Sequence, residues 1–329
     1  MVFNCLAGRY GLRAATLAVA AFTATPAVAQ PAGQWPERPV KLIVPLGAGG
    51  PADLVGRYVA HQLGERFKQS FFIENRTGAA GIIGTAEAAK AAPDGYTLLM
   101  VAASFSVNPS LQAKLPYDTL KDLTPVTMTS HVPYVLVVHP ALPVRTVQEL
   151  VAYDKAKPGA LNYGAAGTQN QLAVELLKLR TGARMVHVAY RSSSLAITDL
   201  IGGQIQMALG STLGVASHVN AGRLRSVAVT SGHRASSMPE VPTIAESGVP
   251  GFNVSAWNGI VTPAGVPAAI AAKLNRDIVS AVRSPDLRDR LAADGGEVVG
   301  NSAEEFARFI RAEMATWAKV VKEAGLRPE

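Results

Sequence analysis

The stretch Val40–Asp53, VKLIVPLGAGGPAD, combines a β-branched run, a glycine-rich turn and the start of a helix. The run Val40–Pro45 predicts a buried strand, and apolar residues recur at helical spacing from Leu54 to Phe67. A strand joined to a helix by a short turn is the repeating unit of parallel α/β sheets. This stretch therefore predicts the first unit of an α/β fold.

The same alternation of short apolar runs and amphipathic stretches continues along the chain. Further strands are expected at Phe71–Glu74, Thr97–Ala102, Tyr134–His139, Leu161–Tyr163, Met185–Tyr190, Gln204–Ala208 and Ser226–Thr230. Helix starts are indicated by capping boxes at Thr146–Glu149 and Ser302–Glu305, and by Pro267 and Pro285. Over 329 residues this pattern predicts open, mostly parallel sheets with helices on both faces, divided between two domains.

Residues 1–29 have the layout of a secretory signal peptide. A positively charged segment with Arg9 and Arg13 precedes the apolar stretch 14–24, and residues 27–29 form a small-x-small cleavage site. We therefore expect a protein exported to the periplasm, with a mature chain that begins near residue 30.

Cleavage of this segment would remove Cys5, the single cysteine. Disulfides and cysteine-ligated metals are then excluded from the mature chain. Cleavage would also lower the formal net charge from +7 to +5, because two arginines are lost. A positive balance favours anionic partners, but no basic run with interleaved aromatic residues occurs, so no nucleic-acid partner is expected.

Ligands of open α/β sheets bind outside the carboxyl ends of the strands, at strand-to-helix turns. The glycines of the turn Gly47–Gly50 let a ligand approach the backbone closely, and a helix begins directly after the turn. The N–H donors of a helix N-terminus suit a carboxylate or phosphate. The turn Gly164–Gln171 is small and polar and contains Thr168. Two such turns facing each other would clamp an anion. The alternatives are a plain tight turn and a capping role for Thr168.

Three further polar turns follow predicted strands. Arg191, in one of them, could pair bidentately with a carboxylate, or it is a solvated surface side chain. The residues expected to contact the ligand are Gly47, Ala48, Gly49, Gly50, Asp53, Ser104, Asn108, Ala166, Gly167, Thr168, Gln169, Arg191 and Ser211.

The first turn also supports a competing interpretation. Its pattern Gly47-x-Gly49-x-x-Ala52 fits a dinucleotide fingerprint, with Glu74 ending the next predicted strand. The export signal argues against an NAD-dependent enzyme, because no pool of free nicotinamide cofactor is expected outside the cytoplasm. Catalytic motifs are missing and the six histidines have no metal-ligand spacing, so no catalytic residue, cofactor or metal is expected. An exported α/β enzyme, recognised by ligand turnover, and a sensor or scaffold remain alternatives.

Several segments, in order along the mature chain, resemble a known family. They are Trp35–Pro45 with the glycine turn, Ile73–Arg76 followed by Gly78–Gly81, Ala92–Leu98, Leu115–Asp118, Asp199–Gly203, Ala228–Thr230, Val241–Thr243 with Glu246–Gly248, and Pro250–Trp257. The chain resembles the substrate-binding proteins of tripartite tricarboxylate transporters, also called Bug-type receptors.

The resemblance implies a type II periplasmic-binding-protein fold, with two doubly wound domains around a ligand cleft. Domain 1 would comprise residues 30–130 and 254–329, and domain 2 residues 131–253. The implied ligand is an organic carboxylate held by Gly47–Gly50 and Gly167–Thr168. The implied partners are the membrane components of the transporter, and a monomer is expected.

Departures from the family pattern bear on the ligand. The first turn reads Gly-Ala-Gly-Gly instead of Pro-Pro-Gly-Gly, and Gln171 replaces a common histidine. Arg191 replaces a lysine, and Gly210 replaces an aspartate that can meet the ammonium group of an amino-acid ligand. A di- or tricarboxylate, or an aromatic acid, is therefore expected rather than an amino acid.

Overall fold

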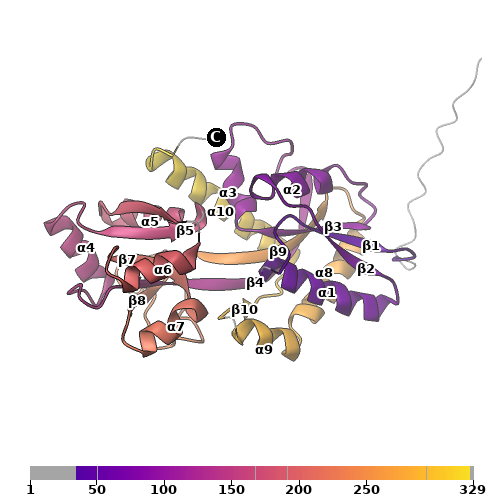
Figure 1. Cartoon of the computed structure of the whole chain (residues 1–329). Helices are drawn as coiled ribbons and strands as arrows, with labels where there is room; N and C mark the ends of the chain where they lie inside the picture. Colours follow the sequence, from indigo (N-terminus) through magenta and orange to yellow (C-terminus); the bar gives the residue numbers. More distant parts are fainter. Residues whose placement is uncertain (1–34, 50, 167, 191, 294, 327–329) are drawn as a thin grey trace, which may run out of the picture.

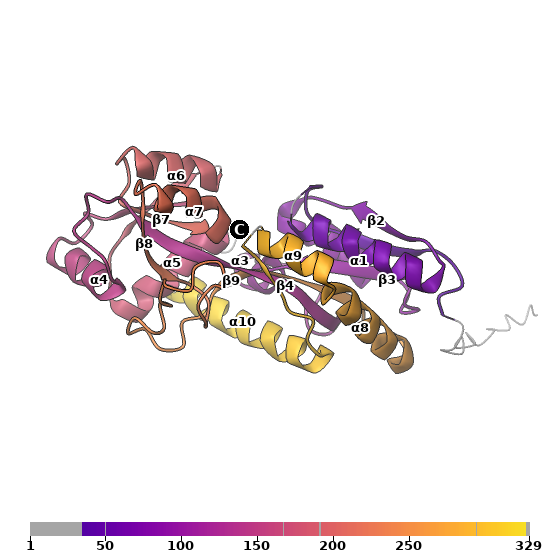
Figure 2. The same cartoon turned by 90° about the horizontal axis from the view of Figure 1, so that it is seen from below.

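The computed structural model describes residues 35–49, 51–166, 168–190, 192–293 and 295–326. The predicted signal peptide, residues 1–29, lies outside this part of the chain. The described residues form an elongated molecule with two lobes, joined by long strands in its middle (Figures 1 and 2). None of the helices within these ranges combines the length and the apolar character needed to cross a membrane.

The first lobe contains a parallel sheet in which β1 (Val40–Val44) lies between β2 (Phe71–Asn75) and β3 (Thr97–Ala102). The elements that follow these strands are α1 (Pro51–Phe67), the 3-10 turn η1 (Ala79–Gly81), α2 (Ile82–Ala89) and α3 (Ser104–Leu111). The lobe is completed from the C-terminal part of the chain by α8 (Ala268–Val282), α9 (Pro285–Ala293) and β10 (Glu297–Val298).

The second lobe repeats this construction. Its parallel strands β5 (Asn162–Ala166), β6 (Val186–Tyr190) and β7 (Met207–Ser211) pair in the order β7–β5–β6. Its remaining elements are α4 (Val147–Ala156), α5 (Thr168–Thr181), α6 (Ser193–Ile201), α7 (Thr212–Asn220) and β8 (Arg225–Val229).

Two antiparallel strands connect the lobes. The first part of β4 (Leu123–Val138) pairs with β9 (Ser255–Pro263), and its last five residues, from Tyr134 onward, pair with β7 and β8 of the second lobe. The chain therefore enters the second lobe along β4 and returns along β9. The predicted α/β class is confirmed, and the antiparallel pairing is concentrated around β4.

The strand predictions succeed where a short apolar run stands alone. The range Thr97–Ala102 is confirmed as β3, and both capping boxes are confirmed, with Thr146 and Ser302 each accepting a hydrogen bond from the third helical residue. The prediction Gln204–Ala208 is wrong in its bounds, because β7 begins only at Met207.

Residues 123–133 of β4 and all of β9 were missed by the sequence prediction. Residues 123–133 contain two prolines and several threonines, and most of them are buried without a simple alternation. Prolines count against a central strand, and burial on both faces removes the period of two that identifies a half-exposed strand.

The C-terminal helix α10 (Ala303–Glu323) packs against both lobes. Phe306 and Ile310 lie in a buried cluster with Trp257 of β9, whereas Trp317 and Val320 lie in the core of the second lobe. The helix therefore bridges the two halves (Figures 1 and 2). The division into domains at residues 130 and 254 stays a prediction.

A buried carboxyl group links α10 to β9. Oε2 of Glu313 accepts hydrogen bonds from the indole N–H groups of Trp257, at 3.2 Å, and of Trp317, at 2.9 Å. Burial raises the pKa of Glu313 above its usual value, and the two indole hydrogen bonds only partly oppose this shift. A carboxyl whose pKa is raised in the folded state contributes stability that is lost as pH rises through that pKa.

We expect Glu313→Gln to be more stable than the wild type at neutral pH, because the amide oxygen still accepts from the indoles and no charge is buried. The advantage should grow as pH rises from about 4.5 through the folded-state pKa. Thermal unfolding across this pH range measures it. Glu323→Gln, at an exposed position of the same helix, is the control and should show no such trend. An advantage independent of pH would contradict the prediction.

Candidate functional site

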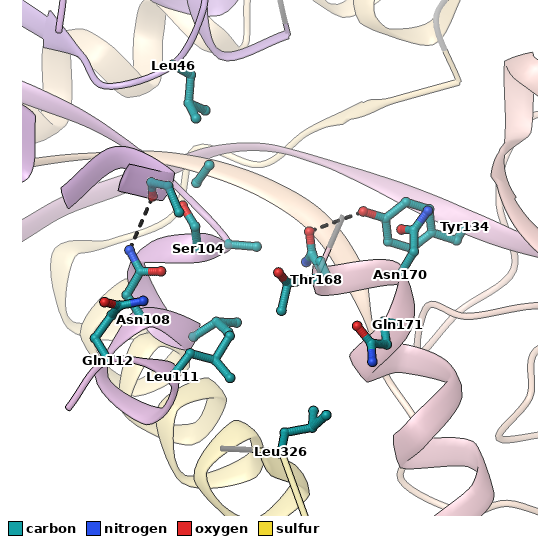
Figure 3. Close-up of a pocket in the computed structure, with 15 residues that line it drawn as sticks. Leu46, Ser104, Asn108, Leu111, Gln112, Tyr134, Thr168, Asn170, Gln171 and Leu326 are labelled. Carbon is teal, nitrogen blue, oxygen red and sulfur yellow. Dashed lines mark hydrogen bonds between the residues drawn. The ribbon is translucent and has the colours of Figure 1, made fainter. Parts of the chain in front are cut away.

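A cavity of about 640 Å³ lies between the lobes, and Figure 3 shows the residues that line it. One wall comes from α3 of the first lobe and the other from the first turn of α5 of the second lobe. Tyr134 of β4, Leu326 beyond α10, and Leu46 and Ala80 of the first lobe also contribute to the lining. The cavity thus adjoins the carboxyl ends of β3 and β5, as expected for ligands of α/β sheets.

Two helix N-termini meet at this cavity. Ser104 starts α3 directly after β3, and Thr168 starts α5 directly after β5, and both residues line the cavity. Figure 3 shows the Thr168 side chain directed into the space between the two helices. The first N–H groups of a helix have no partner within it and carry its positive dipole end. The arrangement suits an anionic group placed between α3 and α5.

Neutral polar groups supply the remaining chemistry of the cavity. Among its described lining residues, no side chain carries a formal charge, and the polar side chains are hydroxyls and amides from Ser104, Asn108, Gln112, Tyr134, Thr168, Gln169, Asn170 and Gln171. Burial raises the pKa of Tyr134, so its hydroxyl stays protonated at neutral pH. Leu46, Val107, Leu111 and Leu326 add an apolar surface.

Gln169 is held by the connecting strands. Its Oε1 accepts from the Tyr134 hydroxyl at 3.1 Å, and its Nε2 donates to the Ser255 carbonyl at 2.8 Å. The start of α5 is therefore fixed to both β4 and β9. Asn108 has a comparable position in α3, since its Nδ2 donates to the Ala80 carbonyl at 3.2 Å and ties the helix to η1.

The first glycine turn is shaped by Asp53. This buried carboxylate accepts hydrogen bonds from the Gly49 backbone N–H, Arg57 Nε and Asn75 Nδ2, each at 2.9 Å. Burial alone would raise the pKa of Asp53, but the hydrogen bonds from Arg57, Gly49 and Asn75 outweigh it and lower that pKa. Asp53 therefore holds the backbone of the turn in place by accepting from the Gly49 N–H.

The predicted contact residues divide into three groups. Ser104, Asn108, Thr168 and Gln169 are brought together at the cavity. Gly47, Ala48 and Gly49 are exposed in the first turn and Asp53 is buried, and none of the four lines the cavity, although Leu46 of that turn does. Ser211 does not line the cavity either and caps α7 by accepting from the Gly214 N–H at 3.2 Å. Gly50, Gly167 and Arg191 lie outside the described residues. Ala166, which precedes Gly167 in the sequence, ends β5.

Some lining residues were not found from the sequence. Asn170 and Gln171 lie in the predicted turn Gly164–Gln171 and could have been included among the contact residues. Tyr134, a polar aromatic residue at the start of an apolar run, could also have been identified. Leu111, Gln112 and Leu326 gave no such signal, because their place depends on how α3 and the end of α10 pack.

Two α/β lobes, joined by β4 and β9 around a cavity at the ends of their strands, define a receptor of the type II periplasmic-binding-protein class. The chain belongs to a family within this class: the model described as "Tripartite tricarboxylate transporter family receptor" matches residues 55–326.

Individual relatives agree with this membership. Protein BugT of Bordetella pertussis is 38% identical over 312 residues, which cover 93% of this chain and 96% of BugT. The structure of R. palustris Rpa4515 with adipate is 34% identical with a TM-score of 0.72, covering 90% of this chain and 100% of that one. MatC (Rpa3494) from Rhodopseudomonas palustris with bound malate is 29% identical with a TM-score of 0.67, covering 87% and 100%. The protein is therefore a solute-binding receptor, and the enzyme interpretation is set aside.

Asp53→Ala should lower the free energy of unfolding by about 1–3 kcal/mol, because it removes a buried carboxylate that accepts three hydrogen bonds at the first turn. Urea unfolding at pH 7 measures the change. Asp289→Ala is the control, since the Asp289 carboxylate is 71% exposed beside Arg288 and such pairs contribute about 0–1 kcal/mol. Equal stabilities of the two variants would show that Asp53 does not hold the turn.

Proposed function

We propose that this receptor works in the periplasm, closes around a small dicarboxylate and delivers it to the membrane components of a tripartite tricarboxylate-type transporter. The observation that carries the proposal is the convergence of the α3 and α5 N-termini on one cavity between the lobes. Both helix ends offer N–H donors and positive dipole ends to a carboxylate.

The chemistry of the solved relatives supports the ligand class. Adipate and malate, the ligands of the two structures named above, are both dicarboxylates. The cavity offers hydroxyl and amide groups for a second carboxylate and an apolar surface, from Leu111 and Leu326 among others, for a carbon chain.

The surroundings of Gly210 argue against an amino-acid ligand. A Cβ atom at this buried position would meet Val215 Cγ1 at 2.3 Å, so an acidic side chain does not fit there unless Val215 shifts. No described residue of the cavity lining is acidic either. The ammonium group of an amino-acid ligand would therefore find no carboxylate partner among the described lining residues.

The lobes provide the means of closure. Because β4 and β9 are the strands that connect them, rotation about this pair would bring α3 and α5 together around the ligand. The ligand would favour the closed form because only in that form does it contact both helices at once.

The direct test is thermal unfolding of protein that has been unfolded and refolded to remove any bound solute. We expect four- to six-carbon dicarboxylates to raise the midpoint by several degrees, since a ligand at about 100 times its dissociation constant adds about 2.7 kcal/mol. Amino acids and NAD serve as controls. A shift with amino acids alone would contradict the ligand class, and a shift with NAD alone would contradict the receptor function.

Thr168→Val should weaken binding of the dicarboxylate found in that panel by about 1–3 kcal/mol, if the hydroxyl at the start of α5 donates to the ligand. Isothermal titration calorimetry measures the affinity. Thr181→Val, at the other end of α5, is the matched control, because its hydroxyl donates to the Leu177 carbonyl at 2.7 Å and lies away from the cavity. Equal affinities would assign the Thr168 hydroxyl to helix capping.

A further inference from the structure

Three side chains of metal-binding type meet beside the strands that connect the lobes. His131 lies on β4, His233 follows β8, and Glu297 starts β10. Oε2 of Glu297 lies 3.3 Å from His131 Nε2 and 3.2 Å from His233 Nε2. All three ligand atoms lie within 4.8 Å of one another, and no other group of three such side chains occurs in the described part of the chain.

The distances approach those of a tetrahedral metal site. Bonds of about 2.0–2.2 Å at tetrahedral angles separate ligand atoms by about 3.3–3.5 Å. Both nitrogen–oxygen distances are already close to this range, so the remaining adjustment is an approach of the two histidine rings. The His233 side chain is 62% exposed and can make that movement, whereas His131 and Glu297 are 14% and 24% exposed.

The carboxylate has an orienting partner on its other oxygen. Oε1 of Glu297 accepts from the backbone N–H and the hydroxyl of Ser236, each at 3.4 Å. Outer partners of this kind hold a ligating carboxylate in position and support metal affinity. Glu297 is also fixed through its backbone, because β10 pairs with β4 opposite His131.

The donor set selects a class of metal. Two imidazole nitrogens and one carboxylate oxygen suit zinc and its transition-metal neighbours, whereas magnesium and calcium prefer oxygen ligands alone. Three protein ligands leave a fourth position for water. We propose that His131, His233 and Glu297 form a binding site for a zinc-class divalent transition metal.

This site would connect the two lobes. Glu297 belongs to the first lobe and His233 to the second, with His131 on the strand between them. None of the three lines the cavity, and Figure 1 shows β10 on the side of β4 away from α3 and α5. A bound metal would therefore restrain rotation of the lobes from outside the ligand site. The metal site would be present whichever solute the cavity binds.

The test uses the protein produced without a polyhistidine tag and treated with a chelator. Titration with Zn²⁺ by calorimetry should reveal one equivalent bound, and Co²⁺ should give visible absorption bands of a low-coordinate site. Mg²⁺ should do neither. His233→Ala and Glu297→Gln should each lower the zinc affinity at least about tenfold, since even loss of an outer partner costs about 10–100-fold.

His61→Ala is the matched control, because His61 and Glu65 form a surface pair 3.9 Å apart on α1 without being part of such a group. Its zinc affinity should equal that of the wild type, and circular dichroism should confirm that all variants are folded. The proposal is overturned by the absence of one-equivalent binding, by Mg²⁺ binding equally well, or by unchanged zinc affinity in folded His233→Ala and Glu297→Gln. In those cases the three residues form a hydrogen-bonded cluster only.

Discussion

The pairing of β4 with β9 is the constraint on which the rest of the structure depends. Its register runs from Leu123 opposite Pro263 to Pro133 opposite Ser255, so the two strands form one ribbon between the lobes. Each functional feature is attached to this ribbon. Gln169 hydrogen-bonds Tyr134 and the Ser255 carbonyl, which positions the start of α5. Trp257 binds Glu313 of α10, and His131 lies opposite Glu297. A change in this register would therefore alter the ligand cavity and the packing of α10 together.

The ribbon also explains why the cavity forms where it does. The parallel strands β3 and β5 both end near it, one from each lobe, and each passes directly into a helix. The N-termini of α3 and α5 thus come from different lobes and line the same cavity. The site is thus a product of the connection between the lobes, and its geometry changes whenever the lobes rotate. In the proposed function, this coupling would allow a bound solute to report its presence to a membrane partner.

The sequence predicted the local units of the structure well and the long-range ones poorly. The segment Val40–Asp53 and the capping box at Ser302 depend on neighbouring residues, and both were recognised. The ribbon was not, because its strands are buried on both faces and therefore lack a period of two, and because β4 also contains prolines. The cavity residues Ser104 and Thr168 were identified through the rule on strand ends, whereas Leu326 required knowledge of how α10 packs. The group of His131, His233 and Glu297 was not predicted either, because these residues are far apart in the sequence and only the fold brings them together.

Charged side chains and neutral side chains have different places around the cavity, and this difference affects how the site attracts an anion. In the first lobe, charged side chains are engaged with one another, as Asp53 is with Arg57 and Lys41 is with Glu87, and none of these four lines the cavity. The described lining of the cavity is neutral, so its attraction for an anion comes from backbone N–H groups and helix dipoles. Such donors are set by the fold and persist when side chains change. In the proposed function, the side chains of Leu111, Gln112 and Gln171 would contact the rest of the solute, while the backbone donors hold its carboxylate.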